Sequence, residues 1–409
     1  MNTEQQNIID LLIKGENIFM TAPAGHGKSR VITELKNNFI GKDIYITSTT
    51  GISALNIEGI TLHSFMGIGL GDSDESVLYN MVSRRVDLVK KLQSNFLLVI
   101  DEASMLSDKL FNKIDYIFKR LRRNNKVFGG VQVLLSSDHL QLEPINESTF
   151  LSNPLLSEFK IIELKVNHRQ QGDKLFQSLL GNLRLNKLTK EDYELLKNKT
   201  NSNIDDTSSI KLYCTNKEVL IENEIYLESN KNKEFIYNAA FSGKNKVYVK
   251  DLEKQFEARG IKKIILKKDL SVMLTRNHNS LGLVNGSMGI IIGFSESNLP
   301  IVSFTHDRDS NDITVVISPV KWELNVNNKL VASATQIPLI LGYAFTIHKI
   351  QGQTLDNAFI DLKNCFCNHQ AYVALSRVKT LNGITLCNFK NIKVNQKTVE
   401  FYNNLNENK

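Results

Sequence analysis

The chain has 409 residues, of which 42% are hydrophobic and 23% are charged, a balance that excludes an intrinsically disordered chain and allows two or three domains. No apolar run approaches the roughly 20 residues of a membrane-spanning helix, and 4 cysteines are too few for a disulfide framework, so we expect a soluble protein of a reducing, intracellular compartment. The formal net charge of +7 favours a polyanionic partner without identifying it.

Short apolar runs rich in β-branched residues alternate with helix-like segments up to about residue 160. The runs are Ile18–Met20, Ile44–Ile46, Phe96–Ile100 and Val131–Leu135. This order predicts an α/β fold with a buried parallel sheet. Polar candidate residues follow the ends of these runs, where an open parallel sheet presents its ligand crevice.

The first run leads into a glycine-rich stretch, Ala22–Ser29, with the sequence APAGHGKS. Small residues there let the backbone amides close around phosphate oxygens at the positive end of the following helix. Lys28 would reach the outer phosphates, and the hydroxyl of Ser29 would hold a magnesium ion. Ala22 stands where the GxxxxGK[ST] pattern has glycine, and its methyl group is compatible only with an ordinary backbone angle.

Two later runs each end in groups suited to hydrolysis. The sequence LLVIDEASML places Asp101 for a magnesium ion and Glu102 for orienting and deprotonating the attacking water. The sequence SSDHLQLEP lets Asp138 and Gln141 project into the same crevice, and the amide of Gln141 suits sensing of the terminal phosphate. Together with the glycine-rich stretch, these residues predict a nucleotide-hydrolysing site.

Phosphoryl transfer also needs cations that neutralise charge on the phosphate oxygens. Arg169 in ELKVNHRQ and Arg377 in YVALSRVK lie outside the first α/β unit, so we expect each to reach the phosphates from an opposing domain. The alternative for each arginine is a surface ion pair. The basic run Lys119–Lys126 is expected to close a helix as a solvated surface.

The second half of the chain is less uniform. A polar stretch at Asn201–Ser209 predicts a surface loop, and Lys262–Phe304 alternates apolar residues with turn signals such as VNGS at Val284–Ser287. The latter pattern predicts a small antiparallel barrel or set of hairpins. Cys365 and Cys367 lack a second pair at the spacing that a zinc site needs.

Three segments in this order resemble the superfamily one helicases of the Pif (petite integration frequency) type, which are related to RecD-like and Dda helicases. They are TTGISALNIEGITLHSFMGIG from Thr49, LGYAFTIHKIQGQTLD from Leu341, and YVALSR. The resemblance covers nearly the whole chain. It implies two RecA-like P-loop NTPase lobes with ATP and Mg²⁺ between them, single-stranded DNA crossing their tops, and movement in the 5′ to 3′ direction.

The resemblance also implies domain boundaries. The N-terminal lobe would span residues 1–158 with a small strand-separating insert at about 66–93. The second lobe would combine residues 159–261 and 336–409, and an SH3-like β-barrel would be inserted at 262–335.

The matching positions imply a role for each site residue. Gln5 would recognise adenine. The nucleotide and its hydrolysis would involve Ala24, Gly25, His26, Gly27, Lys28, Ser29, Asp101, Glu102, Gln141, Arg169, Gly352 and Arg377. The DNA track would include Thr50, Gly51, Thr61, His63, Ser64, Thr346, His348 and Lys349, residue types that contact phosphates without reading bases. Phe65 and Phe345 are candidates for base stacking, although core packing is the commoner role of a single phenylalanine.

These features predict an ATP-dependent DNA helicase that acts as a monomer, without a membrane, on single-stranded and on forked or tailed duplex DNA, in replication, repair or recombination. It would lie in the nucleus or mitochondrion of a eukaryote, or in the cytoplasm of a bacterial or viral host. Two alternatives stay open: an ATP-switched nucleic-acid-binding module that does not unwind, and an RNA-directed helicase. Ser137 and Glu143 depart from the family pattern, which usually has glycine and proline there.

Overall fold

The computed structural model describes residues 1–39, 42–144, 147–200, 209–243, 246–258, 260–276, 278, 281, 283, 286–304, 312–326, 329–390 and 392–407. The chain forms two compact units: Met1–Cys214 with Thr346–Lys409, and Thr215–Phe345. The second unit is therefore longer at both ends than the predicted insert at 262–335. Residues 201–208 of the predicted polar loop, and Val284 and Asn285 of the predicted turn, lie outside the described residues.

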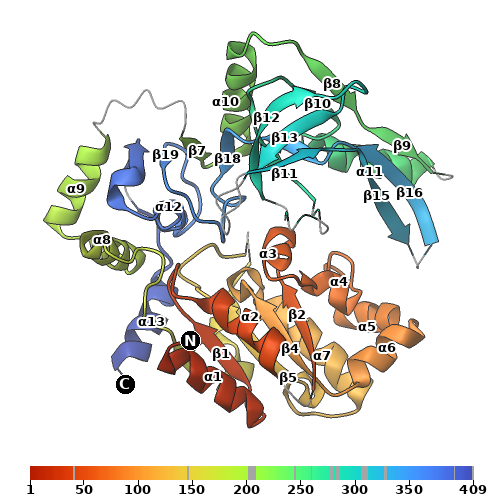
Figure 1. The fold of residues 1–409 in the computed structure, drawn as a ribbon. Coiled ribbons are helices and arrows are strands. Elements are labelled where there is room, and N and C mark those ends of the chain that lie inside the picture. The colour runs from red at the N-terminus through yellow and green to blue at the C-terminus, as the bar shows by residue number, and fades with distance from the viewer. Residues whose placement is uncertain are drawn as a thin grey trace. The chain divides into compact units, whose positions relative to one another are not determined.

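A six-stranded parallel sheet in the order β3-β2-β4-β5-β1-β6 forms the centre of the first unit (Figure 1). Its strands are β1 (Ile18–Thr21), β2 (Asp43–Ser48), β3 (Ile60–Thr61), β4 (Phe96–Asp101), β5 (Gln132–Ser137) and β6 (Lys160–Glu163). The four apolar runs predicted to be strands are confirmed as β1, β2, β4 and β5. Strands β1, β4 and β5 are buried along their whole length, as expected of a parallel sheet covered on both faces.

Helices precede the first of these strands and follow most of them along the chain. They are α1 (Thr3–Ile13), α2 (Lys28–Asn38), α3 (Gly51–Asn56), α4 (Leu62–Met66), α5 (Glu75–Ser83), α6 (Val86–Gln93) and α7 (Asp108–Arg122). Asn2 and Gln5 form a capping box at the start of α1, and the Ser107 hydroxyl accepts from the Leu110 N–H at the start of α7. Helix α2 begins directly after Gly27, whose φ is 84°, so its free amides lie next to the glycine-rich stretch.

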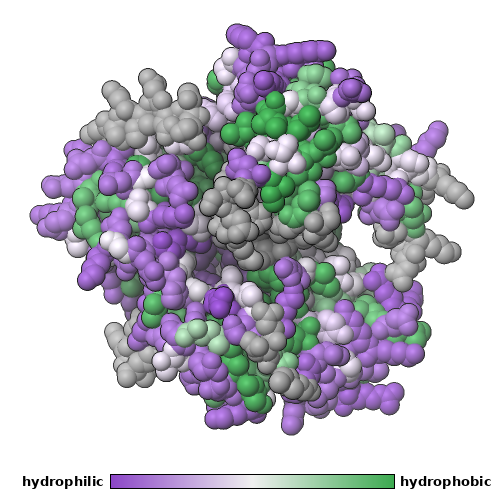
Figure 2. Space-filling model, in the orientation of Figure 1, coloured by the Kyte–Doolittle hydropathy of each residue, from purple (hydrophilic) through white to green (hydrophobic). Residues whose placement is uncertain are grey.

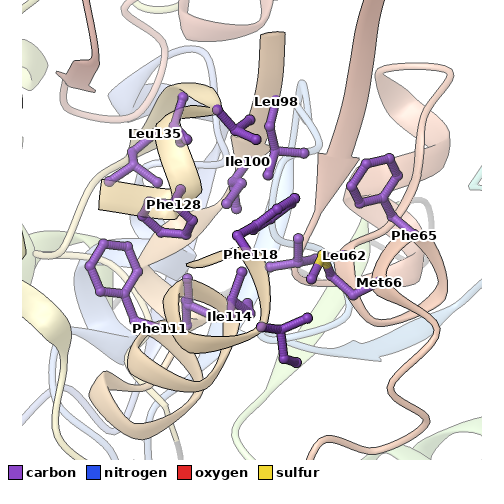
Figure 3. Packing of buried hydrophobic residues seen from close by; sticks show 14 of the residues in the cluster. Leu62, Phe65, Met66, Leu98, Ile100, Phe111, Ile114, Phe118, Phe128 and Leu135 are labelled. Atoms are coloured by element: carbon purple, nitrogen blue, oxygen red, sulfur yellow. The ribbon is translucent and has the colours of Figure 1, made fainter. Parts of the chain in front are cut away.

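The pleat of the sheet separates two apolar clusters. Ile18, Val99 and Leu134 belong to one cluster together with residues of α1 and α2. Leu98 and Ile100 belong to the other, where they pack with Phe118 and its neighbours on α7 (Figure 3). This second cluster includes Leu78, Val82 and Leu92, so α5 and α6, which lie in the predicted insert at about 66–93, are anchored in the core of the sheet.

Side chains of the basic run at the end of α7 form hydrogen bonds and an ion pair within the protein. Arg122 donates to the backbone oxygens of Leu92, Ser94 and Gly129 at 3.1, 2.6 and 2.9 Å. Lys119 pairs with Asp115 at 2.7 Å. The prediction that this run closes a helix is confirmed, whereas its description as solvated surface is wrong for Arg122.

A second parallel sheet in the same unit contains β7 (Ile210–Tyr213), β19 (Ala358–Asp361) and β20 (Ile384–Cys387), with β19 in the middle. The helices before, between and after these strands along the chain are α8 (Lys174–Arg184), α9 (Lys190–Thr200), α12 (Gln370–Leu375) and α13 (Gln396–Glu407). Strand β18 (Ala344–Thr346) crosses the boundary between the two units. The first unit is therefore α/β throughout, as predicted.

A buried ion pair joins α8 to the residue that follows β5. Arg184 Nη2 lies 2.8 Å from Asp138 Oδ1, and the two side chains are 6% and 0% exposed. Burial would raise the pKa of Asp138, but the charge and hydrogen bonds of Arg184 outweigh it and lower this pKa. The prediction that Asp138 projects into the ligand crevice is therefore wrong, because its carboxylate is held inside the protein by Arg184.

The second unit is built mainly from antiparallel strands. One sheet has the order β14-β13-β12-β11-β17, another the order β15-β16-β9, and β8 pairs with β10. The elements are α10 (Asn216–Ser229), β8 (Phe235–Asn238), β9 (Ala240–Ser242), α11 (Lys246–Ala258), β10 (Lys263–Leu266), β11 (Ser271–Leu274), β12 (Met288–Phe294), β13 (Pro300–Phe304), β14 (Ile313–Val316), β15 (Val320–Val326), β16 (Lys329–Gln336) and β17 (Leu339–Leu341). The predicted antiparallel pairing is confirmed.

Apolar side chains remain on part of this unit's surface. Strand β12 alternates, so Ile291 is buried while Ile290 and Ile292 are 53% and 44% exposed. Figure 2 shows hydrophobic side chains gathered over β12 and β13. Within the described part of the chain, none of the helices has the length and apolar character needed to cross a bilayer.

The Asp138–Arg184 pair gives a stability prediction. We expect Arg184→Met to lower the free energy of unfolding by about 3 to 5 kcal/mol near neutral pH, because an unpaired buried carboxylate remains. Arg184 lowers the pKa of Asp138 in the folded protein. The ion pair therefore stabilises the fold at pH values above the ordinary carboxyl pKa, and this stabilisation is lost as the pH falls through the lowered pKa of the folded state. In the variant, burial acts without Arg184 and raises the pKa of Asp138 above its ordinary value, so the carboxylate takes up a proton as the pH falls, and the deficit measured by urea unfolding should shrink between neutral pH and about pH 4.

The double variant Asp138→Asn/Arg184→Met should recover part of the loss. The control is Arg30→Met, which removes an exposed pair with Glu34 at 3.6 Å and should change stability by less than about 0.5 kcal/mol. Equal effects of Arg184→Met and Arg30→Met would contradict the prediction.

Candidate active site

A cleft of about 400 Å³ lies in the first unit at the glycine-rich stretch. It is lined by Ala24, Gly25, His26, Gly27, Lys28, Ser29, Glu102, Gln141, His168, Arg169, Gly352, Thr354, Arg377 and Lys379. Residues from six separate parts of the sequence thus meet at one place. Most of the residues predicted for nucleotide binding and hydrolysis are among them, and His168, Thr354 and Lys379 are additions that the sequence reasoning did not assign.

Two glycines give the loop its shape. Gly25 and Gly27 have φ values of 79° and 84°, in the left-handed region that favours glycine. A Cβ atom on Gly25 would lie 2.5 Å from the Cβ of Arg169, and one on Gly27 would lie 2.6 Å from Nε2 of Gln5. The loop therefore needs glycine at both positions, for its backbone angle and for close packing.

Ala22, which departs from the glycine pattern, causes no strain. It is fully buried in the apolar cluster beside β1, and it is not one of the described residues with a positive φ. Its backbone oxygen accepts a hydrogen bond from Lys28 Nζ at 2.8 Å, and that of Pro23 accepts a second at 3.3 Å. The loop geometry thus accommodates alanine.

Lys28 lies among opposite charges. Burial lowers the pKa of its ammonium group, while the carboxylates of Asp138 and Glu102 act in the other direction. Its neighbour Ser29 is exposed on the first turn of α2. Gln5 is only 2% exposed, and its Nε2 donates to the backbone oxygen of Gly27 at 3.4 Å, so it lies beside the loop.

The acidic pair ends β4. Ser136 Oγ donates to Asp101 Oδ1 at 2.6 Å, and Gln351 Nε2 donates to Glu102 Oε2 at 3.4 Å. Burial, followed by the neighbouring Asp101 carboxylate, raises the pKa of Glu102 to about 7. Glu102 also has a φ of 48°, a left-handed conformation that is costly for glutamate and typical of functional sites. A carboxylate with this pKa is suited to general base catalysis near neutral pH.

Both predicted arginines line the cleft with Lys28. Arg169 Nη1 donates to the backbone oxygen of Ser376 at 2.9 Å, and Arg377 donates through Nε to Val373 O at 3.0 Å. Burial, followed by the charge of Arg377, lowers the pKa of Arg169 to about 9, and burial also lowers the pKa of Arg377. Neither arginine forms a surface ion pair, so the alternative reading is wrong for both. They lie in the same compact unit as the glycine-rich stretch.

Two tyrosines hold the loop region from the other side. The Ala24 N–H donates to the hydroxyl of Tyr372 at 3.0 Å. The hydroxyl of Tyr402 lies 2.6 Å from Thr21 Oγ1 and accepts from the His139 N–H at 3.1 Å. Sequence reasoning missed these contacts because they join residues more than 250 positions apart, as it missed Arg184. For Arg184 a signal existed, since it stands one turn after Leu180 on the apolar face of α8.

The predicted DNA-contacting residues fall into two groups within the first unit. Thr50 and Gly51 follow β2, Thr61 ends β3, and His63 and Ser64 come after it, whereas Thr346, His348 and Lys349 lie at and after the end of β18. The hydroxyls of Thr50 and Thr61 accept from the N–H groups of Ser53 and Ser64, so they also cap α3 and α4. Burial lowers the pKa of Lys349 to about 8.

The prediction that Phe65 stacks on DNA bases is wrong. Phe65 is 1% exposed and packs against Tyr45 and Phe96 at ring distances of 5.1 and 5.9 Å, within the cluster of Figure 3. Phe345 is equally buried. Core packing is therefore the role of both, since Phe65 within α4 and Phe345 within β18 each have a buried ring. Among the described residues no cluster of His, Cys, Asp or Glu side chains is suited to holding a metal ion by itself.

Comparison with known proteins gives consistent results. The profile of the PIF1-like helicase family matches residues 1–193. A Xenopus laevis protein named ATP-dependent DNA helicase PIF1 is 34% identical over 99% of this chain, and the match spans 64% of that protein's length. The chain therefore corresponds to slightly less than two thirds of that relative.

Two solved structures share the fold. The crystal structure of Pif1 helicase from Candida albicans superposes with a TM-score of 0.91 and 30% identity, covering 99% of both chains. Pif1 helicase from Bacteroides in complex with ADP-AlF3 and ssDNA gives a TM-score of 0.73 and 26% identity, covering 99% of this chain and 97% of that one. With this coverage and the cleft described above, the chain belongs to the PIF1-like helicase family.

Proposed function

We propose that this chain is an ATP-dependent DNA helicase that hydrolyses ATP, translocates 5′ to 3′ on single-stranded DNA and unwinds duplex DNA. The observation that carries the proposal is the convergence of Lys28, Glu102, Arg169 and Arg377 on one cleft. Two arginines from outside the first sheet exceed what holding a phosphate requires, and they are suited to stabilising the charge that develops during phosphoryl transfer. The structural relative from Bacteroides supports it, since that protein binds ADP-AlF3 and ssDNA.

The residues divide the chemistry as follows. The amides of the glycine-rich stretch and Lys28 hold the β- and γ-phosphates. Glu102 accepts a proton from the attacking water, and Gln141 orients that water beside the terminal phosphate. Arg169 and Arg377 stabilise the charge that spreads over the phosphate oxygens in the transition state. Gln5 contacts the adenine.

The site also suits a magnesium ion. The Ser29 hydroxyl and the Asp101 carboxylate are hard oxygen donors, and Mg²⁺ is usually held by one or two such groups together with substrate phosphates. These two residues would hold the ion, which would neutralise phosphate charge when bound with ATP.

The motor would use two RecA-like lobes, residues 1–158 and residues 159–261 with 336–409, and an SH3-like domain at 262–335. The two parallel sheets of the first unit support two α/β lobes. The DNA track would comprise the two groups of residues after β2, β3 and β18, whose hydroxyl, imidazole and ammonium groups suit sequence-independent phosphate contacts. The partners would be single-stranded and forked or tailed duplex DNA, bound by a monomer.

The first prediction concerns Lys28. We expect Lys28→Ala to reduce ATP turnover at least about a hundredfold, because the main cation of the loop is lost, while affinity for a single-stranded oligonucleotide stays within a fewfold. Turnover would be measured by phosphate release and binding by fluorescence anisotropy. Lys36→Ala, on an exposed part of the same helix, is the control and should match the parent. Parental turnover in Lys28→Ala would contradict the assignment.

The second prediction concerns strand separation. We expect ATP-driven unwinding of forked duplexes that carry a 5′ single-stranded tail and little unwinding with a 3′ tail alone. DNA-stimulated ATP turnover without strand separation would instead indicate an ATP-switched binding module. Stimulation and unwinding by RNA in preference to DNA oligonucleotides would indicate an RNA-directed helicase.

The third prediction concerns pH. The pKa of Glu102 is raised to about 7, so below that pH the carboxyl group carries a proton and cannot accept another. We expect kcat/KM for ATP, which reports the free enzyme, to rise with pH through about 7 and to level above it. Glu102→Gln should lower turnover by about a hundredfold or more. A flat profile between about pH 6 and pH 8 would exclude Glu102 as the base.

A further inference from the structure

One carboxylate beside the cleft collects hydrogen bonds from a distant part of the chain. Glu143, two residues after Gln141, accepts through Oε1 from Asn395 Nδ2 at 2.7 Å and from Thr398 Oγ1 at 3.1 Å. Through Oε2 it accepts from Asn368 Nδ2 at 3.2 Å. Hydrogen bonds to an ionised group are about twice as strong as neutral ones, so this is a firm attachment.

The three donors belong to the segment that carries Arg377. Asn368 lies just before α12, and Arg377 lies just after it. His369, which begins the helix with a φ of 58°, donates its N–H to Lys393 O at 2.7 Å and accepts at Nε2 from the Asn395 N–H at 3.1 Å. The start of α12 and the residues before α13 are therefore held together, and Glu143 contacts both.

Gln141 lies in the sequence between two residues whose side chains are held by hydrogen bonds, Asp138 and Glu143. At the other end of the loop, Asp138 is held by Arg184. Between them, the Gln141 N–H donates to Asp138 O at 2.9 Å, and Gln141 Nε2 lies 3.3 Å from Asp138 Oδ2. The side chain of Gln141 lines the cleft, whereas Glu143 does not belong to the residues described as lining it.

We propose that Glu143 is a positioning residue that fixes the position of Gln141 relative to Arg377. This inference rests on the proposed ATP hydrolysis at the cleft. The hydrogen bonds of Glu143 with Asn368 and Asn395 connect α12 to the loop after β5. Gln141 and Arg377 therefore approach the terminal phosphate together. Glu143 contacts neither the nucleotide-holding loop nor Lys28 in any recorded hydrogen bond or ion pair of the described residues, so its effect falls on the hydrolytic step and leaves nucleotide affinity intact.

The test exchanges the donor and acceptor roles across the contact. Glu143→Gln turns an amide N–H towards Asn donors and should lower kcat for DNA-stimulated ATP hydrolysis about tenfold, since small misplacements of reacting groups cost that much or more. KM for ATP and the Kd for fluorescent ADP should change less than about twofold, because those contacts are not altered. Asn395→Asp places a second carboxylate against Glu143 and should reduce kcat further.

The double variant Glu143→Gln/Asn395→Asp restores complementarity, because the new amide can donate to the new carboxylate. We expect its kcat to return to within about threefold of the parent, a non-additive rescue that shows direct coupling. The control is Glu147→Gln, the same charge change nearby at an exposed pair with Lys109 at 3.6 Å, which should leave kcat unchanged.

A Glu143→Gln variant with the kcat of the parent would overturn the inference while leaving the proposed function standing. A double variant whose kcat is no higher than that of the slower single variant would do the same. So would parallel losses of kcat, ADP affinity and melting temperature, which indicate a structural role alone. A parent protein that hydrolyses no ATP would overturn the proposed function, and this inference with it.

Discussion

The structure depends on an unfavourable concentration of charge in one cleft. Lys28, Arg169 and Arg377 are cations withdrawn from water, and burial lowers the pKa of each. Glu102 is held against Asp101, and its pKa is raised. Each of these shifts means that folding places an ionised group where it is poorly solvated. A bound polyanion would compensate the three cations, so the site is suited to a nucleoside triphosphate better than to a neutral ligand.

The rest of the fold maintains this arrangement. The parallel strands β1, β4 and β5 deliver the glycine-rich stretch, the acidic pair and Gln141 to one edge of the sheet. Contacts from α8, α12 and α13 then fix that edge: Arg184 on Asp138, Tyr372 on Ala24, and Tyr402 on Thr21. The absence of a side chain at Gly25 lets Arg169 approach the loop closely. The proposed catalytic groups are thus positioned by a scaffold whose own polar contacts are largely buried.

The sequence was sufficient for the α/β core and for most of the cleft. Strands and the loop could be predicted because their signals are local: a β-branched run, then small residues, then a lysine at a helix start. Arg169 and Arg377 were identified from the need for cations in phosphoryl transfer and from the family resemblance, and both line the cleft, where their action on a phosphate is proposed. What failed depended on three-dimensional packing. An aspartate after a strand was expected in the crevice, yet Asp138 is neutralised by an arginine 46 residues away. Phe65 was expected near DNA, yet its ring completes an aromatic core.

The central claim is that Arg169 and Arg377 act on the transition state of a nucleotide bound beside Lys28. The most direct test compares the affinity of each arginine-to-alanine variant for ADP and for ADP with aluminium fluoride, which mimics the transferring phosphoryl group. The account predicts that ADP affinity stays within about twofold of the parent, while the additional affinity for the fluoride complex falls at least about tenfold. Variants that keep the full preference for the fluoride complex would contradict it.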